Sequence, residues 1–295
     1  MSKKFKGAIT ALVTPFLEDG KVDIESLKNL VRFQIKSRID GLVPCGTTGE
    51  TPTLSEDEYR LVIETVVKEV KGRIPIIAGA GSNDTQKAIH HSQIAKKLGA
   101  DALLHVTPYY NKPTPAGLVA HFKAITRAVD LPVILYNVPG RTGSNVSAAT
   151  LIKIIKEVPQ VVGVKEASGN ITQMMDIIKG VPANFSVLSG DDAFTLPLMA
   201  VGGVGIISVA SNQIPKAMHD LTGAALEGNF IKARKLHYQW LDLMNINFIE
   251  SNPIPVKTAL SMMGKIKEVF RLPLVSMEEK NREALKAVLV AHKLI

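Results

Sequence analysis

The stretch Val161-Val162-Gly163-Val164-Lys165-Glu166-Ala167-Ser168 has the composition of a buried β-strand but carries a cation near its end. Burial in an apolar wall removes water from a lysine ammonium group and lowers its pKa. The neutral amine that results is a nucleophile that forms a Schiff base with a carbonyl substrate. The alternative is that Lys165 leaves the core at the end of the strand and extends its ammonium group to water.

Short apolar runs like this one alternate with longer amphipathic segments from the first residues to about position 228. Helical spacing of apolar residues predicts a helix over 24–35, and a capping-box pattern at Ser55–Glu58 predicts the start of another. Eight strands, each followed by a helix, are what a (β/α)8 barrel requires. A doubly wound open sheet is disfavoured, because no glycine-rich dinucleotide turn follows the first strand. The strand candidates are residues 7–14, 41–46, 74–80, 101–107, 132–138, 161–167, 185–190 and 204–210.

Beyond residue 228 the pattern is helical, with helices predicted over 229–248, 253–264 and 277–293. No low-complexity linker separates this region from the rest of the chain. We therefore predict an α/β fold with two parts, a catalytic (β/α)8 barrel over 1–228 and a helical region over 229–295 that packs on the barrel.

Composition indicates a soluble globular protein, with 295 residues of which 46% are hydrophobic and 21% charged. The single cysteine, Cys45, excludes a disulfide framework or a cysteine-based zinc site within one chain. The first residues read as a strand rather than a leader peptide, and no stretch approaches the ~18 apolar residues of a membrane helix. The net charge of +8 is spread among acidic residues instead of gathered on one face. We expect a cytoplasmic protein that binds neither nucleic acid nor membrane.

Polar residues fall where the predicted strands end, which is where barrel enzymes place their reacting groups. Lys165 lies late in the sixth strand and Tyr136 late in the fifth. The segments Gly46–Glu50, Thr107–Asn111 and Ser189–Asp192 follow the second, fourth and seventh strands. This convergence favours Lys165 as a nucleophile over a lysine that only reaches for water.

Each of these residues also has a structural interpretation. Thr47-Thr48 is either an ordinary tight turn or a set of amides and hydroxyls that binds a carboxylate. Tyr136 is either a core tyrosine or the proton relay that imine chemistry needs. Tyr109-Tyr110 suits a subunit interface. Arg141 is either a surface charge or a bidentate partner for a substrate carboxylate.

Two other chemistries are disfavoured. The seven histidines show no ligand spacing on a helix, so we predict no metal site. Phosphate-binding barrels use the loops after strands seven and eight. The loop after the seventh strand holds Asp191 and Asp192, and their carboxylates argue against a phosphorylated substrate.

With these motifs assembled, the chain resembles the 4-hydroxy-tetrahydrodipicolinate synthase family, within the pyruvate-dependent class I aldolases that include N-acetylneuraminate lyase. The resemblance covers nearly the full length. Its motifs are, in chain order, Gly46-Thr47-Thr48-Gly49-Glu50, Thr107-Pro108-Tyr109-Tyr110-Asn111, Tyr136-Asn137-Val138-Pro139-Gly140-Arg141-Thr142-Gly143, Gly163-Val164-Lys165-Glu166-Ala167 and Asn252-Pro253-Ile254-Pro255-Val256-Lys257.

The resemblance implies that Lys165 forms an imine with pyruvate, without a cofactor or metal. It implies that the pyruvate carboxylate binds at Thr47 and Thr48, and that Tyr136 and Thr48 relay protons together with Tyr110 of a neighbouring subunit.

The resemblance implies equally that the enamine attacks aspartate-4-semialdehyde, whose carboxylate is held by Arg141. The main chain near Gly190 and Ile207 would face the site. The product would be 4-hydroxy-tetrahydrodipicolinate, an intermediate of diaminopimelate and lysine biosynthesis. Relatives are homotetramers built from tight dimers.

Two alternatives remain at this stage, a sugar-acid or sialic-acid lyase and a barrel that binds a keto acid without turnover. Arg141 and the Asn252–Lys257 motif favour the synthase. Lysine-inhibited relatives bind lysine at the dimer interface, where the positions here include Tyr59 and Lys87. Because the cationic Lys87 would repel the ammonium group of lysine, we predict weak or absent lysine inhibition.

Overall fold

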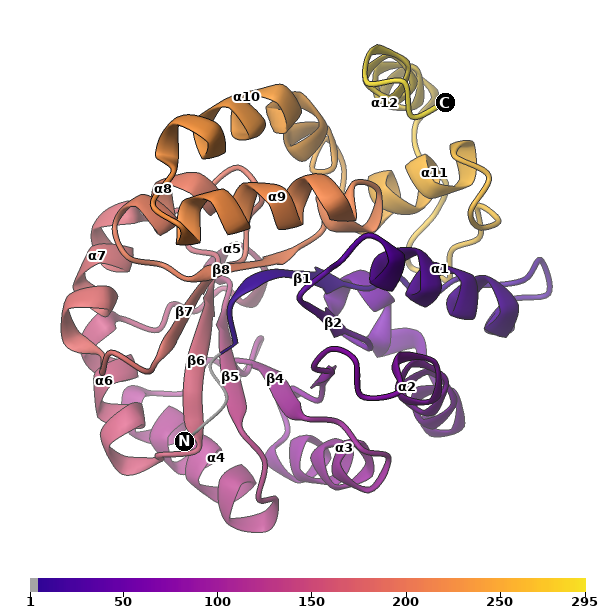
Figure 1. Cartoon of the computed structure of the whole chain (residues 1–295). Helices are drawn as coiled ribbons and strands as arrows, with labels where there is room; N and C mark the ends of the chain where they lie inside the picture. Colours follow the sequence, from indigo (N-terminus) through magenta and orange to yellow (C-terminus); the bar gives the residue numbers. More distant parts are fainter. Residues whose placement is uncertain (1–4) are drawn as a thin grey trace.

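The computed structural model describes residues 5–295 and shows eight parallel strands arranged as a nearly closed barrel (Figure 1). The hydrogen-bonded order is β2-β1-β8-β7-β6-β5-β4-β3, and a parallel bridge between Leu42 and Ile76 joins β2 to the region before β3. The predicted (β/α)8 fold is thus confirmed. The strands are β1 (Gly7–Ala11), β2 (Gly41–Val43), β3 (Ile77–Gly79), β4 (Ala102–Val106), β5 (Val133–Asn137), β6 (Val161–Glu166), β7 (Ser186–Ser189) and β8 (Gly205–Ser208).

All eight predicted strands exist, but each is shorter than predicted, and β2 and β3 show why. The second was expected over 41–46 and ends at Val43, because Cys45 adopts a left-handed φ of 54° that a strand does not accommodate. The third was expected from 74 and begins at Ile77, since Pro75 has no N–H for the ladder. Residues 1–4, the start of the predicted barrel part, lie outside the described residues.

Helices separate the strands and form the outer layer of the barrel (Figure 1). The capping box predicted at Ser55 is present, with reciprocal bonds between Ser55 and Glu58 at the start of α2. The helices are α1 (Ile24–Lys36), α2 (Glu56–Val70), α3 (Thr85–Lys97), α4 (Pro115–Ala128), α5 (Pro139–Thr142), α6 (Ala148–Glu157), α7 (Ile171–Gly180), α8 (Thr195–Ala200), α9 (Pro215–Leu226), α10 (Phe230–Ile246), α11 (Ile254–Met262) and α12 (Glu279–Ala291).

The three helices predicted beyond residue 228 are α10, α11 and α12, and each matches its predicted range within a few residues. Helix α10 packs on α9, and α12 contacts both α10 and α11. Figure 1 shows these helices, in orange and yellow, gathered on one side of the barrel. Within residues 5–295, none of the helices combines the length and apolarity needed to span a membrane.

Two apolar layers surround the strands, one inside the barrel and one between strands and helices. On β5, Ile134 and Tyr136 face the interior, while their neighbours face the helices. On β6 the ladder to β5 shifts by one residue near Val162, so that Ile134 pairs with Gly163. This bulge sets Lys165 opposite Tyr136, with its side chain toward the interior.

Candidate active site

A cavity of about 110 Å³ lies at the carboxyl ends of the strands. It shares four lining residues, among them Thr47 and Tyr136, with an adjoining cavity of about 430 Å³. The two cavities are therefore neighbours, and each is of a size suited to small molecules. The smaller cavity is lined by Thr47, Thr48, Tyr136, Val138, Arg141, Lys165, Ala167, Gly190, Asp191, Val209, Phe248 and Asn252.

Lys165 is 5% exposed, and its Nζ lies 4.1 Å from the centre of the Tyr136 ring. Burial lowers the pKa of Lys165 from 10.5 to about 7, against the opposing effect of the Asp192 carboxylate. A lowered pKa leaves part of the amine neutral and nucleophilic at neutral pH. The interpretation that Lys165 extends to water is wrong, because its side chain ends inside the barrel.

Tyr136 stands on the neighbouring strand with its ring buried and its side chain lining both cavities. Burial raises the pKa of the Tyr136 hydroxyl to about 12, so the phenol is protonated at neutral pH. A protonated phenol beside a neutral amine can donate a proton to an oxygen that leaves the carbon attacked by Lys165.

The Thr47–Gly49 segment forms a single 3₁₀ turn after β2. Close packing fixes this turn, because a Cβ on Gly79 would lie 1.9 Å from the carbonyl oxygen of Cys45. Thr48 is buried, and its Oγ1 accepts a hydrogen bond of 3.0 Å from Nδ2 of Asn252. Thr47 and Thr48 both line the Lys165 cavity, as the predicted carboxylate site requires.

The other predicted site residues lie at different depths in the barrel, and they are Arg141, Gly190 and Ile207. Arg141 lies on α5 at the mouth, where it lines both cavities and donates to the carbonyl oxygen of Asn252 at 3.2 Å. A Cβ added to Gly190 would lie 3.1 Å from Lys165 Cε, so the bare backbone of Gly190 packs on the lysine. Ile207 is buried in the barrel interior and is absent from the residues that line the two cavities.

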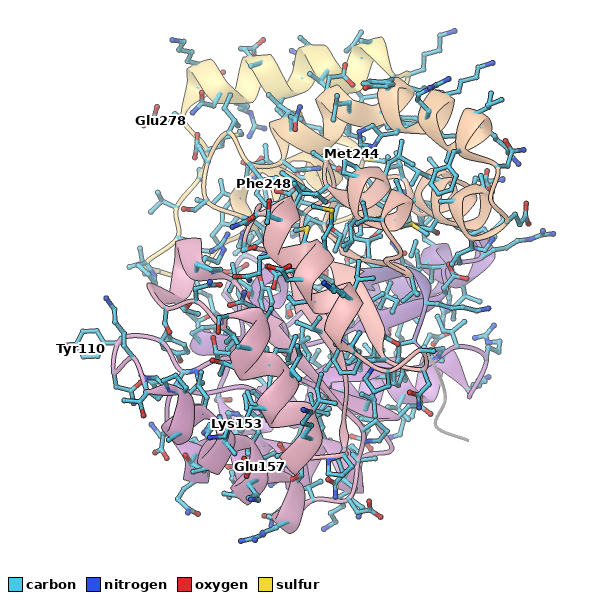
Figure 2. The ribbon with its side chains drawn as sticks, turned by 90° about the vertical axis from the view of Figure 1, so that its left-hand side faces the viewer. Tyr110, Lys153, Glu157, Met244, Phe248 and Glu278 are labelled. Atoms are coloured by element: carbon cyan, nitrogen blue, oxygen red, sulfur yellow. The ribbon has the colours of Figure 1, made fainter. Side chains whose placement is uncertain are left out.

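Tyr110 is a predicted site residue that points away from the cavities of its own chain. It is 90% exposed, and Figure 2 shows it projecting from the loop after β4. Its neighbour Tyr109 lines the larger cavity. A role for Tyr110 in catalysis therefore requires a second protomer.

The carboxylate of Asp192 was missed as a site residue by the sequence analysis, which used it only to exclude phosphate. It is buried after β7 and accepts hydrogen bonds from the Ser208 hydroxyl and from the amides of Val209 and Ala210 at 2.5 to 3.1 Å. Burial raises the pKa of Asp192 to about 6. The negative charge of Asp192 opposes the lowering of the Lys165 pKa. In the sequence, the position of this carboxylate just beyond a buried strand could have marked it as a site residue.

The Asn252–Lys257 motif distinguished the family, but its physical role was not predicted. Asn252 lines the cavity and contacts Thr48. Lys257, fully buried on α11, forms an ion pair with Glu50, the last residue of the motif that contains both threonines. The helical region is thus fastened to the threonine turn. Fold and site together define a (β/α)8 barrel enzyme with a buried, low-pKa lysine facing a tyrosine.

Comparisons with known proteins identify the family within this class of enzymes. The model of the dihydrodipicolinate synthetase family matches residues 4–292, and the chain belongs to that family. It is 55% identical to 4-hydroxy-tetrahydrodipicolinate synthase of Koribacter versatilis over 97% of this chain and 95% of that one.

Solved structures of the same family superpose closely on this chain. Dihydrodipicolinate synthase of Aquifex aeolicus superposes with a TM-score of 0.96 at 48% identity, covering 98% of this chain and 99% of that one. The enzyme of Acinetobacter baumannii, solved in complex with pyruvate, superposes with a TM-score of 0.96 at 46% identity, covering 99% and 100%.

Proposed function

We propose that the protein is a 4-hydroxy-tetrahydrodipicolinate synthase that condenses pyruvate with aspartate-4-semialdehyde. The observation that carries the proposal is the buried, low-pKa amine of Lys165 in a cavity lined by the Thr47-Thr48 turn. Full-length similarity to synthases supports the same activity over that of a sugar-acid or sialic-acid lyase. The place of this reaction is diaminopimelate and lysine biosynthesis.

In the first half-reaction the Lys165 amine attacks the ketone carbon of pyruvate, whose carboxylate is held at Thr47 and Thr48. Tyr136 protonates the carbinolamine hydroxyl, which leaves as water and gives the imine. The Tyr136 phenolate left by this step takes a methyl proton from the imine, which gives the enamine and restores the phenol. All of these steps use side chains of the protein, so the proposal includes no metal and no cofactor.

In the second half-reaction the enamine carbon attacks the aldehyde carbon of aspartate-4-semialdehyde, and the aldehyde oxygen takes a proton from the relay. Arg141 at the mouth binds the carboxylate of this substrate. The amine of the adduct then attacks the imine carbon and displaces Lys165, which closes the ring and regenerates the enzyme. The backbone of Gly190, which packs on Lys165, lies against the substrate. Ile207 packs beneath the substrate site, inside the barrel.

The proposal includes a cytoplasmic homotetramer of tight dimers, in which Tyr110 enters the cavity of the partner subunit. The 90% exposure of this tyrosine and its place next to Tyr109, which lines the larger cavity, support such an exchange.

Borohydride reduction in the presence of pyruvate tests the mechanism. Peptide mass mapping is expected to find the reduced pyruvate adduct on Lys165. An adduct on another residue, or none, would overturn the mechanism. Condensation is then compared for aspartate-4-semialdehyde and N-acetylmannosamine, and faster condensation with the sugar would overturn the proposed second substrate.

A further inference from the structure

A buried hydroxyl has one proton to donate and two lone pairs that accept, and the direction of the proton decides which group it serves. Thr48 is 2% exposed, and within residues 5–295 the hydrogen bond recorded for its hydroxyl comes from Asn252 Nδ2 at 3.0 Å. An amide N–H can only donate, so Thr48 is the acceptor in this bond. Its own proton remains free for an acceptor in the cavity.

The acceptors that the cavity offers include the Tyr136 hydroxyl, the Asp191 carboxylate and the oxygens of a bound substrate, since Thr48, Tyr136 and Asp191 line the same space. A hydrogen bond received at Oγ1 also polarises the O–H bond and makes it a stronger donor. The contact with Asn252 therefore both aims and strengthens the proton of Thr48.

Asn252 is itself held in place by independent contacts. Arg141 donates a hydrogen bond of 3.2 Å to the main-chain carbonyl oxygen of Asn252. Five residues further along the chain, Lys257 is fixed by its buried ion pair with Glu50. The side-chain amide oxygen of Asn252, Oδ1, is buried and has no hydrogen-bond partner among the described residues.

We propose that Asn252 is a positioning residue that fixes the direction of the Thr48 hydroxyl proton toward the cavity, and so sets the direction of the proton relay. The inference rests on the proposed imine chemistry and deepens it. It gives the helical region beyond the barrel a part in catalysis, through a contact between residues 204 positions apart in the chain.

The test is a double-mutant cycle between Asn252 and Thr48, measured as exchange of the pyruvate methyl protons for deuterium by NMR. This exchange needs the imine and enamine but no aldehyde. Asn252→Ala should slow this exchange about tenfold, because it removes one hydrogen bond between uncharged groups. Asn252→Asp should slow it about a hundredfold, because a carboxylate only accepts and turns the Thr48 proton away from the cavity.

In a Thr48→Val background both Asn252 substitutions should change the exchange rate less than about twofold, because residues acting through one another are not additive. Asn247→Ala is the matched control, since this buried asparagine bonds to Gln213 and lines neither cavity. It should leave exchange within about twofold of wild type. Thermal unfolding verifies that each variant is folded.

Fully additive losses, or an Asn252→Asp enzyme with exchange near the wild-type rate, would overturn the role of Asn252. Wild-type condensation with aspartate-4-semialdehyde is assayed separately. Its absence with intact exchange would overturn the proposed second substrate and leave the role of Asn252 standing. Absence of exchange in the wild type would overturn both.

Discussion

Burial makes the amine of Lys165 reactive near neutral pH. A lysine with the ordinary pKa of 10.5 is almost wholly protonated at pH 7, whereas burial lowers the pKa of this one to about 7. The neighbouring strand supplies the Tyr136 phenol, which remains protonated over the same range. The pair thus combines a nucleophile and an acid.

A pH profile tests this electrostatic tuning. The rate of imine formation with pyruvate should rise with pH through about 7 and then level off, because only the neutral amine attacks. Asp192→Asn removes a negative charge that favours the protonated lysine, so the midpoint should move to lower pH. The measurement is the pH dependence of single-turnover imine formation. A midpoint that stays in place or rises would contradict the role of Asp192.

Gly190 gives a steric prediction at the same site. Gly190→Ala places a Cβ 3.1 Å from both Cγ and Cε of Lys165 and 2.6 Å from Cβ of Ala167. A displaced nucleophile reacts poorly, so kcat should fall about a hundredfold. Gly223→Ala on α9 is the control, because its Cβ meets no atom within 4 Å. Its kcat should match wild type, and similar values for both variants would contradict the steric role.

At the level of elements, the helical region is joined to the barrel by buried charge. Lys257 on α11 pairs with Glu50, donates to the carbonyl oxygen of Val269 at 2.7 Å and lies 4.3 Å from the centre of the Phe16 ring. Glu50 also accepts from the amide of Arg271 at 3.2 Å. This network connects the threonine turn, the loop after β1 and the segment after α11.

Lys257→Met should lower the free energy of unfolding by about 3–5 kcal/mol, because it leaves the Glu50 carboxylate buried without its cation. Combining it with Glu50→Gln should restore part of the loss. Urea denaturation measures both. Lys68→Met, which breaks an exposed pair with Glu64, is the control and should change stability little. Equal effects of the two lysine substitutions would contradict the network.

For the whole molecule, the exposed Tyr110 predicts that the active site is shared between protomers (Figure 2). Lys165→Ala and Tyr110→Phe should each be inactive or weakly active alone. Mixed and reassembled, they should regain activity, because some mixed dimers contain one site with both residues intact. The measurement is the condensation rate before and after mixing, together with the mass of the assembly. Failure to regain activity in mixed dimers would contradict the exchange.

Lysine is not expected to regulate this protein strongly. Tyr59, one of the positions compared with lysine-binding relatives, is buried and donates to the carbonyl oxygen of Gly79 at 3.0 Å, so its hydroxyl is already engaged. Lys87 is exposed. Added lysine should therefore inhibit weakly or not at all. Half-maximal inhibition at submillimolar lysine in a steady-state assay would contradict this prediction.

The sequence by itself determined the number and order of the strands and of the helices beyond residue 228, because these elements carry their own periodic patterns. It also brought Lys165, Tyr136 and the Thr47-Thr48 turn together, since parallel strands deliver their carboxyl ends to one face of a barrel. These parts depend on neighbours in the chain and on one general rule of the fold.

Only the tertiary structure decided which face of β6 is inside. A strand that is apolar on both faces gives no alternation to read, so either Lys165 or its neighbour Glu166 suited the interior. The bulge near Val162 and the register with Tyr136 settle the choice. Glu166 turns outward and accepts hydrogen bonds from Asn137 and Ser168. Contacts such as Asn252 with Thr48 lie beyond sequence patterns too, because they depend on how distant elements pack.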